Sequence, residues 1–204
     1  DDSVMTFAVA DWLLNDKNHT PEVLTDTFVW FAHKYPCPLG GYGDSFYNWL
    51  TNPKTVFEDV VMEDGSTRTL MHDVREPYNS WGNGSAMRVS PVGLYATSLE
   101  EALSLAEITA SVSHNHPEGI KGAQAVAACV FLNKPSMDGK SSNDFRRKCP
   151  IVNYIEKTFG YDIIHRKLDD IRPTYTFDVS CQGSVPQAIR AYLESKSLEE
   201  KENS

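Results

Sequence analysis

The sequence has little of what marks membrane, secreted or zinc-binding proteins. Its longest apolar run extends from Ala125 to Leu132, far short of the roughly 20 residues that a membrane helix needs. No basic segment followed by an apolar stretch stands near the start, so we expect no secretory signal. The four cysteines lie far apart without a C-x-x-C pair, which argues against a disulfide framework or a zinc site and favours a reducing, cytoplasmic compartment.

Positive charge is scarce as well. The sequence has 19 Lys and Arg residues against 28 Asp and Glu residues, which gives a formal net charge of −9 at pH 7. Because a field of this sign repels phosphate backbones, nucleic acid is not an expected partner. A polyphosphate ligand would have to be held locally, by metal ions, backbone amides or a single arginine.

Several short motifs are present only in part. Gly82-x-Gly84 lacks the third glycine of a dinucleotide-binding turn, and its flanks do not show the strand-then-helix order of that turn. His116-Pro117-Glu118 matches the first half of a zinc deaminase signature, but no P-C-x-x-C follows. G-x-S-x-G is absent, so a hydrolase built on a serine elbow has no support.

Helical periodicity dominates the 204 residues, a length that fits a single domain over 1–204. Apolar residues recur at three- and four-residue spacing in at least six segments. Typical helix-start residues accompany them at Asp2, at Thr20 before Pro21, at Ser98 with Glu101, at Pro117, and at Ser184 with Gln187. We therefore predict an all-α domain.

One segment departs from the helical pattern. Residues 56–71 alternate loosely around Glu63-Asp64-Gly65-Ser66, and an Asp-Gly pair between two apolar stretches is typical of a β-hairpin. We therefore predict a small exposed hairpin, inserted between helices at 56–71.

Two adjacent acids, Asp1 and Asp2, stand at the beginning of the first predicted helix. Since neighbouring carboxylates repel each other, the pair suggests a compensating cation, and oxygen ligands suit Mg²⁺ or Mn²⁺. The alternative is an ordinary helix cap beside a solvated charge, because aspartate is a common capping residue. From the pair alone both interpretations stay open.

Two glycine-containing segments could bind a phosphorylated ligand. In residues 40–44, Gly-Gly-Tyr-Gly-Asp, backbone N–H groups can approach an anion, although a simple turn would use the same residues. The segment from Tyr78 to Arg88 combines small residues, hydrogen-bonding side chains, Trp81 and one arginine. Such a set suits a ligand with a flat base, sugar hydroxyls and phosphate.

His114 belongs to the run Ser-His-Asn-His-Pro-Glu-Gly at 113–119, where one predicted helix ends and the next begins. A histidine at this place either borders the cleft beside the turn or interacts favourably with the C-terminal end of the preceding helix. The sequence leaves both roles open.

Together these segments resemble the ADP-ribosylglycohydrolase family. Residues 1–6 resemble its T-D-D-T/S metal motif without the leading Thr, and residues 40–44 resemble its glycine-rich phosphate loop. Residues 80–91 and 113–119 resemble its most specific signatures, and residues 180–186 match a later segment. The matches follow the family's order over nearly all of the chain.

The resemblance implies an orthogonal helical bundle with two Mg²⁺ or Mn²⁺ ions in a central cleft. Asp1 and Asp2 would be metal ligands, and Asp2 and Asp44 would be the acids available for catalysis. The substrate-binding residues implied by the family are Gly41, Gly43, Ser80, Trp81, Gly82, Asn83, Gly84 and His114. The glycine segments would hold the diphosphate of ADP-ribose, His114 would contact its sugar hydroxyls or phosphate, and Trp81 would border the base.

The activity implied is metal-dependent hydrolysis of the glycosidic bond between ADP-ribose and a modified protein side chain or a related conjugate. The family's downstream G-G-D-x-D-T motif and its upstream G-D-x-x-G segment do not occur, so we expect the domain over 1–204 to be incomplete at both ends. The alternative is a non-catalytic ADP-ribose binder, or a structural, crystallin-like relative that kept the fold.

Overall fold

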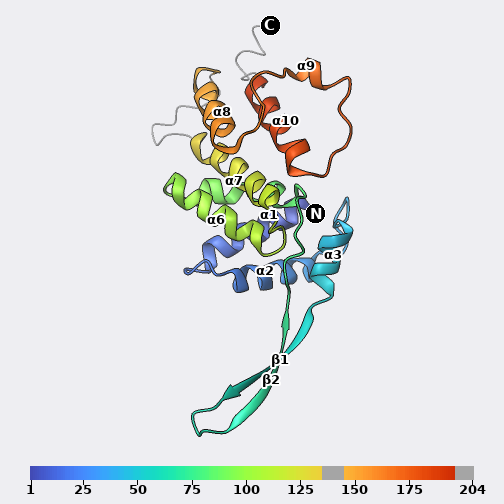
Figure 1. The fold of residues 1–204 in the computed structure, drawn as a ribbon, viewed down its shortest axis with the longest axis vertical. Helices are drawn as coiled ribbons and strands as arrows, with labels where there is room; N and C mark the ends of the chain where they lie inside the picture. Colours follow the sequence, from blue (N-terminus) through green and yellow to red (C-terminus); the bar gives the residue numbers. More distant parts are fainter. Residues whose placement is uncertain (135–144, 196–204) are drawn as a thin grey trace.

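The computed structural model describes residues 1–134 and 145–195, which are mainly helical with one two-stranded antiparallel hairpin (Figure 1). The elements are α1 (Asp2–Asn15), α2 (Pro21–Lys34), α3 (Asp44–Thr51), β1 (Lys54–Val61), β2 (Thr67–Val74), α4 (Gly84–Met87), α5 (Ser90–Tyr95), α6 (Leu99–Ser111), α7 (Pro117–Leu132), α8 (Phe145–Phe159), α9 (Leu168–Ile171) and α10 (Cys181–Glu194). The predicted all-α fold with an inserted hairpin is confirmed. Within the described ranges, no helix is both long enough and apolar enough to cross a membrane.

Helix α7 lies at the centre of the helical part, in contact with α4, α5, α6, α8 and α10 (Figure 1). Its small residues allow these close approaches. A Cβ on Gly93 of α5 would lie 2.6 Å from the carbonyl oxygen of Ala127, and a Cβ on Gly122 would collide with the sulfur of Cys181 in α10. Glycine at these two positions therefore lets the neighbouring helices pack directly against α7.

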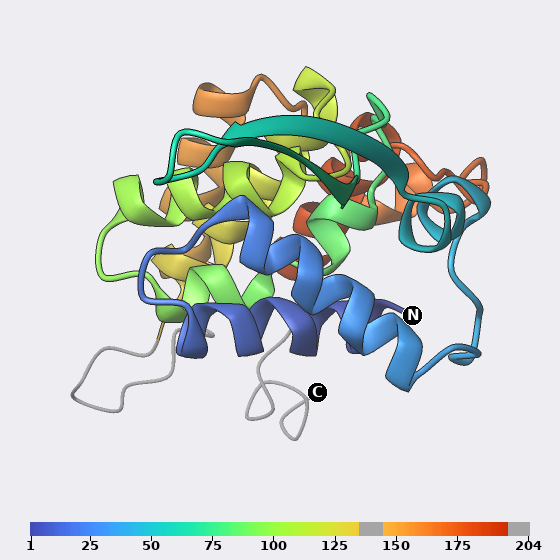
Figure 2. The ribbon, with the colours of Figure 1, turned by 90° about the horizontal axis from the view of Figure 1, so that it is seen from below.

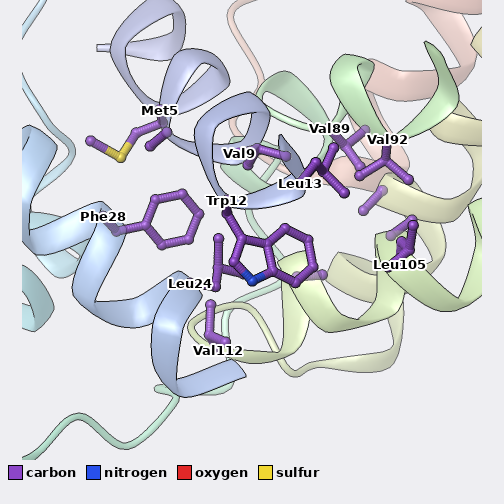
Figure 3. Packing of buried hydrophobic residues seen from close by; sticks show 14 of the residues in the cluster. Met5, Val9, Trp12, Leu13, Leu24, Phe28, Val89, Val92, Leu105 and Val112 are labelled. Carbon is purple, nitrogen blue, oxygen red and sulfur yellow. The ribbon is translucent and has the colours of Figure 1, made fainter. Parts of the chain in front are cut away.

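Two clusters of buried apolar side chains pack on different faces of α7. The first includes Trp12 of α1 with Leu24 and Phe28 of α2 (Figure 3), where α1 and α2 lie side by side (Figure 2). The second includes Ile155 of α8 and Ile189 of α10. Full burial of such a side chain contributes about 1.5–3 kcal/mol to the stability of the fold. The two clusters therefore stabilise α7 from two sides, and α7 in turn supports the segment at its own N-terminus.

The starts of α2, α6 and α7 agree with the sequence prediction. Helix α2 begins at Pro21, and the hydroxyl of Ser98 accepts a 3.1 Å hydrogen bond from the N–H of Glu101 at the start of α6. Helix α7 begins at Pro117, and the ring of His116 caps it by accepting a backbone N–H. Local capping residues therefore identified these three starts correctly.

The predicted start at Ser184 is wrong. Helix α10 begins at Cys181, and Ser180 is its cap, because its hydroxyl accepts a 3.0 Å hydrogen bond from the N–H of Gly183. The N–H of Cys181 donates to the carbonyl oxygen of Trp81 over 3.0 Å. Both serines have the local pattern of a cap, and this long-range bond fixes the helix start at the first of them.

The prediction that Asp2 caps α1 is also wrong. The helix begins at Asp2 itself and Asp1 occupies the cap position, but the side chain of Asp1 makes no capping hydrogen bond. The backbone closes the first turn instead, with the N–H of Met5 donating to the carbonyl oxygen of Asp1 over 3.0 Å. Neither carboxylate is therefore used to cap the helix.

The predicted hairpin is confirmed and is longer than 56–71. Its strands run from Lys54 paired with Val74 to Val61 paired with Thr67, and the hairpin projects away from the helices (Figure 1). Gly65 in the turn has φ +79°, a backbone conformation that glycine adopts without strain. The strands are exposed along almost their whole length, so the hairpin contributes little to either buried cluster.

Candidate functional site

A cavity of about 490 Å³ lies where the start of α1, the loop before α3, the segment before α4 and the α6–α7 turn meet. Its walls include every predicted site residue except Trp81, namely Asp1, Asp2, Gly41, Gly43, Asp44, Ser80, Gly82, Asn83, Gly84 and His114. The fold therefore brings acids, glycine turns and a histidine from distant parts of the sequence to one place.

Backbone hydrogen bonds hold the segment before α4 in position along this cavity. The N–H of Tyr78 donates to the carbonyl oxygen of Ser113 over 3.1 Å, and the N–H of Asn83 donates to the carbonyl oxygen of Val179 over 2.7 Å. The amide of Asn83 also donates to the hydroxyl of Ser184 over 2.9 Å. The segment is thus fixed between the α6–α7 turn on one side and the start of α10 on the other.

Glycines allow this segment to approach the α6–α7 turn closely. A Cβ on Gly119 would lie 2.6 Å from the carbonyl oxygen of Ser80 and 2.9 Å from that of His114. A Cβ on Gly84 would lie 3.1 Å from Nε2 of His114. A side chain on Gly119 would force these backbones apart, and one on Gly84 would press against the ring of His114, so the glycine pattern in the sequence has a structural reason at this site.

Asp1 and Asp2 are half-buried at the edge of the cavity. Among the described residues neither carboxylate has a hydrogen-bond partner. The Oδ1 atom of Asp1 lies 3.7 Å from the place that a Cβ on Gly40 would take, so the carboxylate of Asp1 faces the glycine loop. Two roles were open for the pair, and the structure does not show the helix cap, because neither side chain makes a capping hydrogen bond.

The acid pair fits part of a ligand set for a hard cation, but not a complete one. Within residues 1–134 and 145–195 no group of three or more His, Cys, Asp or Glu side chains is placed to hold a metal ion. Mg²⁺ and related ions prefer oxygen ligands in a roughly octahedral arrangement. Asp1 and Asp2 supply two such carboxylates, so the described residues could hold an ion only together with other ligands.

The glycine loop before α3 is a turn with two residues in the left-handed region. Gly40 has φ +92° and Gly41 has φ +69°, and the N–H of Gly41 donates to the carbonyl oxygen of Pro38 over 2.9 Å. This amide is therefore used within the turn. Gly43 precedes α3, and Asp44 occupies its first turn with an exposed carboxylate on the cavity wall.

Arg88 lines the cavity and was not among the predicted site residues. Its side chain is buried, and Nη2 donates to the carbonyl oxygen of Thr109 over 2.6 Å and to the hydroxyl of Ser113 over 2.7 Å. The guanidinium lies over the ring of Phe28, 4.4 Å from its centroid. Burial lowers the pKa of Arg88 to about 10, and no acid pairs with it in the described part of the chain.

The sequence did contain a signal for Arg88. It is the single cation in a segment of small and hydrogen-bonding residues, within an acidic chain. A cation at such a place is a natural partner for an anionic ligand. Periodicity alone could not tell whether this arginine pointed into the fold or into solvent.

Two further residues border the cavity from the loop between α9 and α10. Phe177 and Val179 lie on its wall although their side chains are 92% and 59% exposed. An exposed aromatic side chain at the rim of the cavity is available to stack on a planar ligand group. No pattern in the sequence indicates this position, because the α9–α10 loop meets the cavity only through the tertiary fold.

Trp81 is the predicted site residue that lies elsewhere. Its half-exposed ring packs edge-on against His116, with the ring centroids 5.8 Å apart, and it is not part of the cavity wall. Its carbonyl oxygen accepts the N–H of Cys181. In this conformation Trp81 helps to place the segment rather than to line the cavity.

A second cavity of about 610 Å³ lies between α4, α7, α9 and α10. Its walls are mainly apolar, and it shares Asn83 and Met87 with the first cavity. It contains none of the acids and no histidine. The polar chemistry is therefore concentrated in the first cavity, despite its smaller volume.

Residues 1–192 match the family model described as ADP-ribosylglycohydrolase. The chain belongs to the ADP-ribosylglycohydrolase family. All residues that line the cavity lie within the matched range. The match thus covers both the acid pair and the α6–α7 turn.

Three curated relatives have similar sequences. ADP-ribosylhydrolase ARH3 of Mus musculus is 31% identical over 168 residues, which cover 79% of this chain and 38% of the relative. ADP-ribosylhydrolase ARH3 of Homo sapiens is 30% identical over 151 residues, 71% of this chain and 37% of the relative. An uncharacterized protein of Archaeoglobus fulgidus is 31% identical over 122 residues, 57% of this chain and 40% of the relative. The chain therefore spans about two fifths of the length of the curated relatives it matches.

Proposed function

We propose that the protein is a metal-dependent hydrolase that cleaves the glycosidic bond between ADP-ribose and a modified protein side chain. The observation that carries this proposal is one cavity in which Asp1 and Asp2 face the glycine turns and His114. Membership of the ADP-ribosylglycohydrolase family supports the reaction class, as does the name ADP-ribosylhydrolase borne by two relatives.

The proposed substrate suits the size and the chemistry of the cavity. Its volume of about 490 Å³ falls in the range of small-molecule sites. In this proposal the backbone N–H groups of Ser80, Gly84 and Gly43 hold the diphosphate, since those of Gly41, Gly82 and Asn83 are already bonded within the protein. His114 contacts the phosphate or a ribose hydroxyl from the α6–α7 turn.

The proposal assigns the acids of this chain to two tasks. Asp1 and Asp2 would contribute carboxylate oxygens to Mg²⁺ or Mn²⁺, together with further ligands. A bound divalent cation supplies polarisation of the ribose hydroxyls and a water of lowered pKa. Asp2 and Asp44, both on the cavity wall, are the acids available to accept a proton from the attacking water.

The direct test is release of free ADP-ribose from an ADP-ribosylated protein in the presence of Mg²⁺ or Mn²⁺. Hydrolysis that stops when the cation is chelated supports the proposal. Absence of turnover with both ions, over a panel of proteins modified on different side chains, would exclude it.

A second candidate function is binding of ADP-ribose without hydrolysis, or a purely structural role. The observation in its favour is that the described residues gather no group of three metal-ligating side chains. Calorimetry with ADP-ribose and the cation separates the candidates. Binding without product release identifies a binder, and absence of both binding and release identifies a structural relative.

We also propose that the protein works in a reducing compartment, the cytoplasm. All four cysteines are free, including the exposed Cys37 and the buried Cys181, which suits a compartment that keeps thiols reduced. Localisation of the tagged protein by microscopy tests this, and an extracellular or membrane-enclosed location would contradict it.

A further inference from the structure

Three side chains are linked from Arg88 through Ser113 to His114, and the first and last of them line the cavity. The Nη2 atom of Arg88 donates to the hydroxyl oxygen of Ser113 over 2.7 Å. The same oxygen lies 2.9 Å from Nδ1 of His114. Ser113 is fully buried, Arg88 is 2% exposed and His114 is 5% exposed, so water does not compete for these bonds.

The chemistry of the groups decides which ring nitrogen carries the proton. A guanidinium can only donate, so the oxygen of Ser113 is the acceptor in its bond with Arg88. The hydroxyl proton of Ser113 then has one partner among the described residues, which is Nδ1 of His114. If Nδ1 carried a proton instead, the hydroxyl proton of Ser113 would be buried without an acceptor, which is unfavourable. The bonding pattern is complete only when Nδ1 accepts and Nε2 carries the proton.

The Nε2 atom of His114 is directed towards the glycine turn. Positions for a Cβ on Gly82 and on Gly84 lie 3.6 Å and 3.1 Å from Nε2, and this turn lines the cavity. Within the described residues Nε2 has no hydrogen-bond partner. An N–H donor with a fixed direction is therefore available to a ligand in the cavity.

The groups around the ring favour its neutral form. The rings of Tyr78 and Phe46 pack against the imidazole at centroid distances of 5.4 and 6.3 Å. Among the described residues, Arg88 is the one charged group that acts appreciably on the ring, although the carboxylates of Asp1, Asp2 and Asp44 lie on the wall of the same cavity. Burial and, secondarily, the charge of Arg88 lower the pKa of His114 to about 3, so the ring is uncharged at neutral pH.

We propose that Arg88 and Ser113 are positioning residues for His114. They hold its ring so that Nε2–H, next to the turn that contains Gly82 and Gly84, donates to an anionic or hydroxyl group of the ligand. The three residues together direct one N–H into the cavity in a chain that carries a net negative charge. The identity of the ligand, ADP-ribose, rests on the proposed function, whereas the protonation pattern of His114 is a property of the free protein.

Nitrogen-15 NMR of the histidine rings in the free protein at pH 7 tests the pattern directly. His114 is expected to show a protonated Nε2 and an unprotonated Nδ1, and this pattern should persist when the pH is lowered to 5. The exposed His72 on the hairpin serves as a reference for a ring in solvent. A proton on Nδ1, or on both nitrogens, would overturn the proposal without any variant being made.

Substitution of Ser113 tests the consequence for binding. Ser113→Ala removes the bond that orients the ring, and its expected effect is a roughly 2- to 10-fold loss of ADP-ribose affinity together with a mixed protonation pattern. Ser111→Ala, two residues earlier on α6 and outside the cavity wall, is the matched control and should retain both properties. An unchanged ring pattern in Ser113→Ala would contradict the positioning role.

The two measurements also separate this inference from the proposed function. A wild-type protein with the expected Nε2–H pattern that does not bind ADP-ribose would overturn the proposed ligand while the role of Arg88 and Ser113 stands. A protein that binds ADP-ribose with His114 protonated on Nδ1 would overturn that role and leave the proposed function intact.

Discussion

The carboxylate of Asp1 lies 3.7 Å from the place that a side chain on Gly40 would fill. The two residues are far apart in the sequence, and their contact joins the acid pair at the start of α1 to the glycine turn before α3. This arrangement is possible because the carboxylate of Asp1 does not cap its own helix. The acids thus line the same cavity as His114, and several measurable consequences follow from that arrangement.

Asp2→Asn removes one charge of the acid pair at nearly constant volume. We expect loss of metal-dependent ADP-ribose release, because a neutral amide is a poor ligand for Mg²⁺ or Mn²⁺. The free energy of unfolding should fall by at most about 1 kcal/mol, through the weaker interaction with the positive end of the helix. Asp11→Asn, an exposed position on the same helix, should retain activity. Equal loss of folding and activity in Asp2→Asn would indicate a structural role for this acid.

Phe177→Ala tests the aromatic side chain at the rim of the cavity. Stacking of a base on an aromatic ring contributes about 1–3 kcal/mol, so we expect the affinity for ADP-ribose to fall by roughly 5-fold or more. Stability should hardly change, since the side chain is 92% exposed. Phe57→Ala on the exposed hairpin is the control. If calorimetry finds the same affinity in both variants, Phe177 does not contact the ligand.

The pH dependence of folding should reveal the buried His114. Its pKa is lowered to about 3 in the folded protein, whereas an unfolded histidine titrates near 6.5. As the pH falls below about 6.5, His114 takes up a proton in the unfolded state but stays neutral in the folded state. Stability is therefore lost on acidification, by up to about 1.4 kcal/mol per pH unit.

Urea unfolding at several pH values between 7 and 5 measures this dependence. In that interval an unfolded histidine titrates, whereas carboxylates titrate mainly at lower pH. His114→Gln should flatten the slope over that interval, and His72→Gln on the hairpin should leave it unchanged. A wild-type free energy of unfolding that stays constant from pH 7 to pH 5 would contradict the buried neutral ring.

Deletion of the hairpin should leave the helical fold and the cavity intact. The residues at its base, Lys54 and Val74, are directly paired, so their Cα atoms are about 5 Å apart and a two-residue Asn-Gly turn can join them. We expect helical content by circular dichroism and ADP-ribose binding to be retained. Loss of cooperative unfolding in the shortened protein would show that the hairpin supports the fold.

Local sequence signals determined much of the helical architecture. The starts of α2 and α6 follow from Pro21 and Ser98, because a capping hydrogen bond or a fixed proline φ involves only the next few residues. The hairpin followed in the same way from the Asp-Gly turn at 64–65. The same reasoning was wrong at Ser184. Both Ser180 and Ser184 have the local pattern of a cap, and the long-range hydrogen bond from Cys181 to Trp81 selects Ser180.

The sequence by itself thus determined the longer helices and the hairpin and, through the resemblance, which segments line the cavity. Only the tertiary structure decided that Trp81 packs outside the cavity, that Phe177 reaches its rim and that Arg88 is buried against Ser113. The physical reason is the range of the interactions. Caps and turns depend on neighbours along the chain, whereas the burial and direction of a side chain depend on residues that only the folded chain brings together.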